Sequence, residues 1–401
     1  MDLPSEGEEI WRYSRIADLD LDRYTPLPAS AVGEVVMEDL PADLARLVNR
    51  AGREATVVLS RNGGPATVLH PQEGLDVGPA GPEPLGGAEA GPPPALAGPR
   101  ADIFSALNGA FVRVPWRAQV ARGVTLRAPL VLVHWLEGEG AALFPRLEVE
   151  VGAGSSADVI EVIASPEDAL LAVPLTKLVL APGSRLRFGQ VQVLGSRSWQ
   201  VGNQVSRVSH DAMLRSITVA FGGDYARVRT DSVLEGVGGN SELFAAYFGS
   251  GEQVHDLRTV QHHAAPRSRS NLLFKGAVAN RARSVYSGLI RVEKGAKGTN
   301  AFQTNRNLVL SPGAEAYSVP NLEIEDNDVR CSHASAVGPI DESQMFYLES
   351  RGVPTRSAGR LIALGFMDDV LNSFPVASLR PWLREALAMK LSAAGLGGAA
   401  P

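Results

Sequence analysis

Residues 217–251 read ITVAFGGDYARVRTDSVLEGVGGNSELFAAYFGSG, and this stretch decides the fold. Two short apolar segments, Ile217–Phe221 and Leu243–Phe248, each end in a glycine-rich turn. Apolar and polar residues alternate in the first segment, which is typical of a strand that is buried on one side. The stretch therefore predicts short β-strands joined at tight turns.

The same pattern extends in both directions along the chain. Strand-like segments rich in Val, Leu, Ile, Phe and Thr recur from about residue 101, and from Pro182 onward their turn signals fall about 13 residues apart. No long helical pattern interrupts them, which argues against units of alternating strand and helix. A sandwich, a barrel and a β-solenoid are the candidate architectures.

Polar residues inside the strand-like segments favour the solenoid. The tract Thr299–Asn307 carries Thr, Asn and Gln within a strand pattern. Stacked coils tolerate such residues on their inner face, because the side chains can hydrogen-bond to neighbouring coils. The alternation described above would also fit a sandwich. We predict a mainly β chain with a solenoid core.

Composition divides the chain into four regions. Residues 1–73 carry helical hints, and residues 74–100 are dominated by Gly, Pro and Ala. The second region predicts a flexible loop, since it buries too little apolar surface to offset its ordering entropy. Residues 101–338 form the β core. Residues 339–401 change to helical spacing and predict a C-terminal helical domain.

Charge and cysteine content exclude several classes of protein. The 401 residues include 38 Lys and Arg against 44 Asp and Glu, a net charge of −6, which argues against a nucleic acid or an anionic membrane as the main partner. The acidic start lacks the apolar segment of a signal peptide. Cys331 is the only cysteine, so an intrachain disulfide and a Cys-rich metal site are impossible. We expect a cytoplasmic protein.

The strongest chemical candidate is the pair Cys331 and His333. In an extended segment, residues i and i+2 point to the same face, so this thiol and imidazole would form half of a soft-metal site suited to iron or zinc. Two ligands cannot complete tetrahedral coordination, so the others must come from elsewhere. A buried structural cysteine beside a hydrogen-bonded histidine is the alternative interpretation.

Two further patterns carry functional hypotheses. The four carboxylates Glu323, Glu325, Asp326 and Asp328 could serve acid/base chemistry or a hard metal ion, although a solvated acidic loop explains them better. Near the C-terminus, an apolar stripe with helical spacing includes Leu379, Trp382, Leu383 and Leu387. Such a stripe either packs within the chain or docks a partner.

Ordered motifs in the C-terminal half resemble the SufB/SufD family of iron–sulfur cluster assembly proteins. They are residues 307–311 (NLVLS), 320–324 (PNLEI), 328–333 (DVRCSH) and 346–353 (FYLESRGV), with weaker agreement at 282–290 (ARSVYSGLI) and 8–14 (EEIWRYS). Of the two branches, the start and the modest length favour SufD. One departure is that Ala334-Ser335-Ala336 follows the histidine, where the family usually has Gly-Ala-Thr.

The resemblance implies a right-handed parallel β-helix with N-terminal and C-terminal helical regions. It also implies a non-catalytic subunit that pairs with SufB through the β-helix core and docks the ATPase SufC through its C-terminal helices. His333 matches a proposed ligand of a transient iron–sulfur cluster shared with the partner subunit, and Cys331 is its neighbour. The docking residues would be Leu379, Trp382, Leu383 and Leu387. The isolated chain could also form a homodimer.

Several points stay open at the level of sequence. A SufB-like principal cluster scaffold is one alternative, which the single cysteine disfavours. A β-helical carbohydrate-active enzyme that uses the acidic residues is another. Direct flavin or iron binding is not decided by these residues, and no nucleic-acid or membrane partner is expected.

Overall fold

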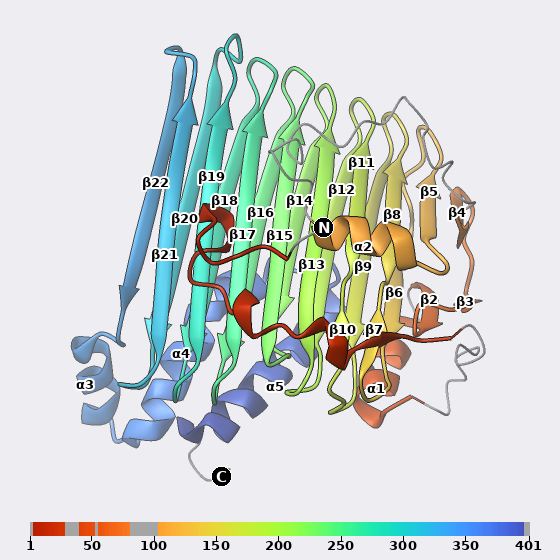
Figure 1. Cartoon of the computed structure of the whole chain (residues 1–401). Helices are drawn as coiled ribbons and strands as arrows, with labels where there is room; N and C mark the ends of the chain where they lie inside the picture. The colour runs from red at the N-terminus through yellow and green to blue at the C-terminus, as the bar shows by residue number, and fades with distance from the viewer. Residues whose placement is uncertain (1–2, 29–39, 53–54, 81–102, 397–401) are drawn as a thin grey trace.

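The computed structural model describes residues 3–28, 40–52, 55–80 and 103–396 (Figure 1). The chain folds into a parallel β-solenoid of about eight turns, with helices at the C-terminus. The prediction of a mainly β solenoid is therefore confirmed.

Among the described residues, the strands form two long sheets that face each other. The first sheet contains, in spatial order, β4 (Leu75–Pro79), β5 (Trp116–Val120), β8 (Arg146–Val151), β11 (Leu175–Leu180), β13 (Trp199–Val208), β15 (Tyr225–Leu234), β17 (Val254–His263), β19 (Arg283–Val292) and β21 (Glu315–Ile324), with the short strands β1 (Thr25–Pro26), β7 (Ala141–Leu143) and β10 (Leu171–Ala172) beside this row. The second sheet contains β3 (Ala66–Leu69), β2 (Thr56–Arg61), β6 (Leu130–Trp135), β9 (Ser156–Ala164), β12 (Arg185–Val193), β14 (Met213–Ala220), β16 (Asn240–Gly249), β18 (Arg269–Val278), β20 (Thr299–Val309) and β22 (Val329–Gly338).

From β11 onward, successive strands lie in opposite sheets, and each pairs in parallel with the strand two positions along. This connectivity makes each pair of strands one coil of the solenoid. The coil turns sharply at glycines. A Cβ at Gly222, for example, would lie 2.2 Å from the carbonyl oxygen of Leu194, so the turn accepts no larger residue.

The interior changes character along the solenoid. The first coils are filled by apolar side chains such as Leu147, Leu178 and Phe188. In the last coils polar residues face inward and bond to each other: Asn305 Nδ2 donates to Tyr247 Oη at 3.0 Å, and Tyr247 Oη donates to Asn307 Oδ1 at 2.7 Å. Hydrogen bonds between coils therefore satisfy these buried polar groups, as we inferred for this tract.

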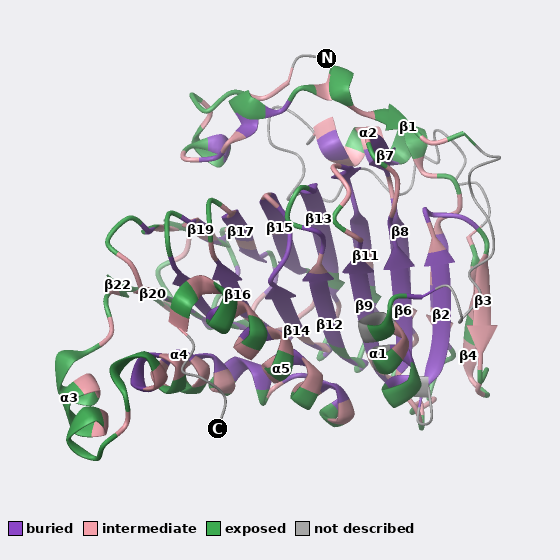
Figure 2. Ribbon diagram, turned by 90° about the horizontal axis from the view of Figure 1, so that it is seen from below, coloured by how far each residue is buried: buried purple, intermediate pink, exposed green. Residues whose placement is uncertain are grey.

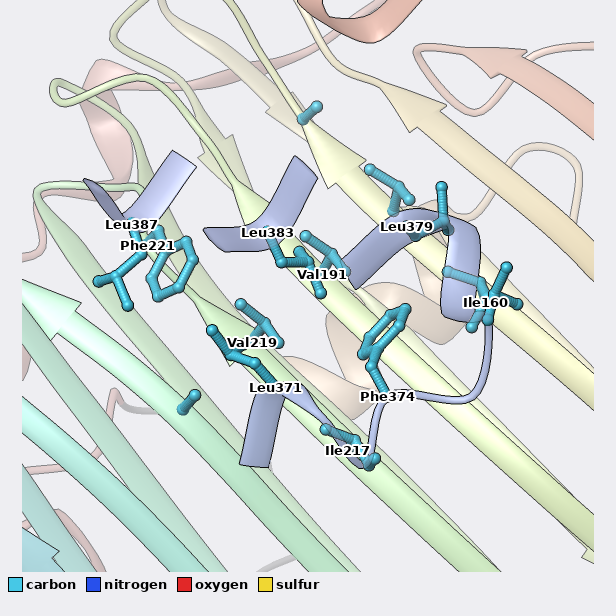
Figure 3. Packing of buried hydrophobic residues seen from close by; sticks show 14 of the residues in the cluster. Ile160, Val191, Ile217, Val219, Phe221, Leu371, Phe374, Leu379, Leu383 and Leu387 are labelled. Atoms are coloured by element: carbon cyan, nitrogen blue, oxygen red, sulfur yellow. The ribbon is translucent and has the colours of Figure 1, made fainter. Parts of the chain in front are cut away.

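Helices cover the outer face of the second sheet. They are α1 (Ala42–Gly52), α4 (Thr355–Leu371) and α5 (Arg380–Leu391), preceded by the 3-10 turn Ala377–Leu379 and followed by a π-helical turn Ser392–Leu396. Figure 2 shows these helices on one side of the sheets. In Figure 3, leucines of the C-terminal helices pack on Val191, Ile217 and Val219 of the sheet. α2 (Ile103–Phe111) lies on the other side, and α3 (Glu342–Ser350) contains no buried residue.

The N-terminal segment crosses the outer face of the first sheet. It contains three 3-10 turns, Glu9–Trp11, Ile16–Asp18 and Leu21–Arg23. Two arginines of the sheet bind its backbone: Arg227 Nη2 donates to the carbonyl of Ile10 at 2.8 Å, and Arg258 Nη2 donates to that of Arg12 at 2.7 Å. Tyr13 stacks on Tyr317, with ring centroids 4.7 Å apart. The segment thus connects the middle of the sheet to its last strand.

The boundaries differ from the sequence prediction at the N-terminal side. The solenoid was expected to begin at residue 101, but β2 already pairs with β6 in the second sheet and β4 with β5 in the first. β4 lies inside the predicted loop 74–100, whose residues 81–100 are outside the described part. The expected N-terminal helical region, residues 1–73, therefore contains strands as well as α1. In the described part of the chain, no helix combines the length and apolar composition needed to cross a membrane.

Candidate functional site

The last coil of the solenoid carries the candidate site. β22 pairs with β20 and β21 pairs with β19, and among the described residues no further strand adds to either of them. Both strands are ten residues long. Their outer edges therefore present backbone donors and acceptors that another strand could pair with.

The register places Cys331 and His333 on the inward face of β22. Cys331 is paired with Ala301 and His333 with Gln303, and both partners are buried in the solenoid interior. Ser335 continues the same face, and its hydroxyl bonds to Ser318 of β21 across the interior at 2.7 Å. The thiol and the imidazole therefore lie together at the end of the solenoid.

The two side chains have different environments. Cys331 is a free thiol, half-buried against an apolar group that includes Ile290, Val292 and Ala301. This burial raises the pKa of the Cys331 thiol, and a hydrogen bond from the backbone of Ala301 only partly opposes it. His333 is exposed. Burial thus favours the thiol form of Cys331 over the thiolate, while His333 is open to an external group.

Apolar residues of the last coil are exposed although they point to the interior side. Leu322 and Ile324 of β21 are 37% and 42% exposed, and Val337 of β22 is 46% exposed. Their register partners one coil earlier are Ile290 and Val292 for β21, which are both fully buried. Exposed apolar surface of this kind is typical of interaction sites, and a terminal coil without a polar cap leaves its core open to water.

The acidic stretch nearby has a structural explanation. The carboxylate of Asp326 accepts hydrogen bonds from the backbone of Asp328 at 3.0 Å and of Gly295 at 3.1 Å, and these hydrogen bonds, with the Asp328 one strongest, lower the pKa of Asp326. Within the described residues, no three side chains of His, Cys, Asp or Glu gather in a group that could hold a metal ion. This arrangement does not favour the carbohydrate-active alternative.

Two adjacent histidines point to opposite faces of β17. His262 faces outward and its Nε2 lies 2.7 Å from Glu293, whereas His263 faces inward between the hydroxyls of Ser268 and Ser270. Burial lowers the pKa of His263 to about 3, so it is neutral near pH 7. The pair is not a joint ligand site.

The leucines predicted to dock a partner are buried within the chain. Leu379, Leu383 and Leu387 are at most 1% exposed and pack on the second sheet (Figure 3). Trp382 is half-buried and packs against the same apolar cluster. The stripe therefore fastens α5 to the solenoid. The exposed apolar residues of the helical region lie elsewhere: Phe346, Tyr347, Leu361 and Met389, which are 72%, 58%, 53% and 62% exposed.

The available ligands suit part of an iron site. A thiol and an imidazole are ligands that iron accepts, and an iron–sulfur cluster commonly takes four protein ligands. The last coil supplies two of them, so a cluster here would need the others from a second chain. The open apolar end provides the surface at which such a chain could bind.

Comparison with known proteins agrees with this geometry. Residues 134–366 match the SufBD core domain of SUF system FeS cluster assembly. The chain is 33% identical over 315 residues, or 73% of each chain, to an iron–sulfur cluster assembly SufBD family protein of Mycobacterium tuberculosis. It is 26% identical to the iron–sulfur cluster assembly protein SufD of Escherichia coli, covering 97% of this chain and 89% of that one. It is also 28% identical to SufD of Bacillus subtilis, covering 71% and 64%. The chain therefore belongs to the SufBD family of iron–sulfur cluster assembly proteins.

Proposed function

We propose that this protein is a SufD-like, non-catalytic scaffold subunit of a cytoplasmic iron–sulfur cluster assembly complex. It pairs with a SufB-like subunit through the open end of the solenoid and docks a SufC-like ATPase through its C-terminal helices. The nascent cluster is the cargo of this complex, held transiently at the boundary between the two solenoids.

The open end is the observation that carries the proposal. A solenoid partner can continue both sheets by pairing with β21 and β22, and it can bury Leu322, Ile324 and Val337 in doing so. Pairing through strand edges adds backbone hydrogen bonds to the apolar contact. A second copy of this chain offers the same kind of end, so we also propose that the isolated chain can form a homodimer through it.

His333 and Cys331 would be this chain's contribution to holding iron. His333 is exposed on the face that the partner would cover, and Cys331 lies one inward position before it. Because the thiolate is the metal ligand, binding through Cys331 must release its proton. We therefore assign the primary role to His333.

The C-terminal helices support the docking of an ATPase, but through different residues from the buried leucines. α3 exposes Phe346 and Tyr347, and the guanidinium carbon of Arg351 lies 5.2 Å from the centroid of the Tyr347 ring. Aromatic residues beside arginine are enriched at the energetically important centres of interfaces. These residues of α3 form the proposed docking surface.

A SufB-like principal scaffold is the second candidate. The one cysteine of the chain argues against it, since a cluster held by this chain alone would need more ligands than Cys331 and His333. Reconstitution of a stable cluster on the isolated chain would favour it.

The test is to co-express the chain with SufB-like and SufC-like partners and to measure the mass and iron content of the native complex. We expect a complex of all three, and we expect His333→Ala to lose most of the iron while the complex stays assembled. The matched control is His210→Ala, because His210 is also exposed, at 59%, and lies on a turn away from the last coil. Iron content that does not change in His333→Ala would contradict the proposed role.

A further inference from the structure

A glutamine directly behind the proposed ligand has no hydrogen-bond partner. Gln303 of β20 is 1% exposed, and neither its amide nitrogen nor its amide oxygen bonds to any other group in the described residues. Its neighbours on the inward face, Asn305 and Asn307, are by contrast bonded to Tyr247 and to each other. An amide buried without a partner costs free energy, so its presence needs a reason.

The register places this amide next to His333. The two residues are paired on adjacent parallel strands and share the inward face, Gln303 in the last buried coil and His333 in the open one. Side chains at such positions are direct neighbours along the solenoid axis. Gln303 therefore lies one coil behind His333, on the side opposite to an incoming partner.

The opposite sheet makes room for the amide at this level. A Cβ added to Gly288 of β19 would lie 2.5 Å from Gln303 Nε2 and 2.2 Å from Tyr286 Oη. The glycine thus allows the amide to reach across the interior, and any larger residue would displace it. The hydroxyl of Tyr286 is already paired with Thr259 at 3.0 Å. His333, which is paired with Gln303 in the register, is the neighbouring side chain that remains available as a hydrogen-bond partner.

We propose that Gln303 is a positioning residue for His333. When a partner chain covers the solenoid end, the free amide oxygen of Gln303 accepts a hydrogen bond from one ring N–H of His333, which fixes the tautomer and turns the other ring nitrogen, with its lone pair, out of the solenoid end. Histidines that bind metal ions commonly donate their second N–H to a carbonyl in this way, and loss of that contact weakens metal binding by about 10–100-fold. This inference rests on the proposed function of His333.

The test compares variants of two buried glutamines. Gln303→Met removes the amide at nearly constant size, and Gln200→Met is the matched control, because Gln200 of β13 is also fully buried with both amide atoms unpaired but lies far from the last coil. His333→Ala is the reference. Three quantities are measured: the iron retained by the co-expressed complex, the unfolding midpoint of the isolated chain, and the tautomer of His333 from its ring ¹⁵N shifts in a complex in which only this chain is histidine-labelled.

We expect Gln303→Met to reduce the affinity for iron by about 10–100-fold and to bring the His333 tautomers toward those of a free imidazole. The unfolding midpoint should stay the same or rise, since an unpaired buried amide has been removed, and Gln200→Met should retain iron and tautomer as in the wild type. If Gln303→Met does not fold, Gln303→Asn withdraws the carbonyl by one methylene and should show the same losses.

The outcomes separate the two hypotheses. Wild-type iron and tautomer in Gln303→Met, with iron lost in His333→Ala, would overturn the positioning role and leave the proposed function intact. Iron lost equally in Gln200→Met would also overturn it, because a general effect of interior polarity would then explain the result. Iron retained in His333→Ala would overturn both.

Discussion

The two ends of the solenoid are built differently. At the first end, the sheets finish with β3 and β4, which are four and five residues long and run antiparallel to their neighbours. At the last end, they finish with β21 and β22, ten residues each and parallel to the strands before them. Short antiparallel strands end a sheet, whereas a long edge strand leaves a row of backbone N–H and C=O groups with which a further strand can pair.

The two ends also differ in how far their apolar side chains are buried. Val68 and Leu75 of the closing strands pack against the buried cluster that contains Val58 and Leu130. Leu322 and Val337 at the other end remain exposed. The hydrophobic core is therefore covered at the first end of the solenoid and exposed to solvent at the last end. The exposed apolar residues of the last coil are thus a specific feature, not a general property of this solenoid.

The largest effect should come from charging the open end. Leu322→Asp combined with Val337→Asp would bury unpaired carboxylates against a partner, which costs about 4 kcal/mol or roughly a thousandfold in affinity. Stability of the isolated chain should change little, since both residues are exposed. Binding to the SufB-like subunit is measured by calorimetry. Val179→Asp, at an apolar position that is 42% exposed on the outer face of β11, should bind normally; equal loss in this control would refute a specific interface.

The opposite result is expected near the closed end. Leu130 of β6 is fully buried, and Leu130→Ala should lower the free energy of unfolding by about 3 kcal/mol through the cavity that it leaves. Urea unfolding measures this change. Partner affinity of the folded variant should remain that of the wild type. Leu361→Ala, at an exposed position of α4, should change stability by less than about 0.5 kcal/mol.

A pH-dependent effect is expected where α5 is fastened to the covered face. Lys390 Nζ donates to the carbonyl of Phe221, to Gln253 Oε1 at 2.8 Å and to the carbonyl of Phe248 at 3.3 Å. Burial lowers the pKa of Lys390 from 10.5 to about 7. Between pH 7 and pH 10.5, the unfolded chain therefore binds the proton of Lys390 more readily than the native chain does. The contribution of Lys390 to the free energy of unfolding consequently rises from pH 7 to pH 10.5 and is lost as the pH falls through 7.

Thermal unfolding at pH 7 and pH 9.5 measures this dependence. The wild type should gain stability relative to Lys390→Met as the pH rises, while partner binding at the open end should not follow the same trend. The neighbouring His255 does not interfere, because burial lowers its pKa to about 3. Parallel pH profiles for the two proteins would show that Lys390 does not titrate in this range.

The smallest effect should come from the exposed ion pairs along the middle coils. Arg187 Nε donates to Asp158 Oδ1 at 2.6 Å, and the two side chains are 53% and 25% exposed. A double-mutant cycle with Arg187→Met and Asp158→Asn should give a coupling energy of about 0.2–1 kcal/mol, since water and salt screen the pair. A larger coupling would mean that outer-face charges, and not the core, hold adjacent coils together.

The sequence predicted the repeated coils but not where they begin. Alternation and glycine turns identify strands such as β14, whose Ile217 and Val219 face the helices while Thr218 faces inward. β2 was missed because Val57, Val58 and Leu59 are all buried, so this short apolar run shows no alternation. β4 was missed because it starts a segment rich in Gly and Pro.

The candidate site was predictable in part. The spacing of Cys331 and His333 is enough to place them on one face of a strand. That this strand is the last of its sheet depends on what the following residues do, and no local pattern reports it. An amphipathic stripe such as Leu379, Leu383 and Leu387 likewise looks the same whether it packs on its own chain or on a partner. Gln303 could be recognised only once its neighbours were known.

The N-terminal segment has a consequence for how the protein is made. This segment is synthesised before Arg227 and Arg258, which donate to the carbonyls of Ile10 and Arg12 and follow them by 217 and 246 residues. Tyr317, against which Tyr13 stacks, is synthesised later still. The N-terminal segment can therefore dock only after the strands that bind it have been synthesised, so its contacts form late in the folding of the chain.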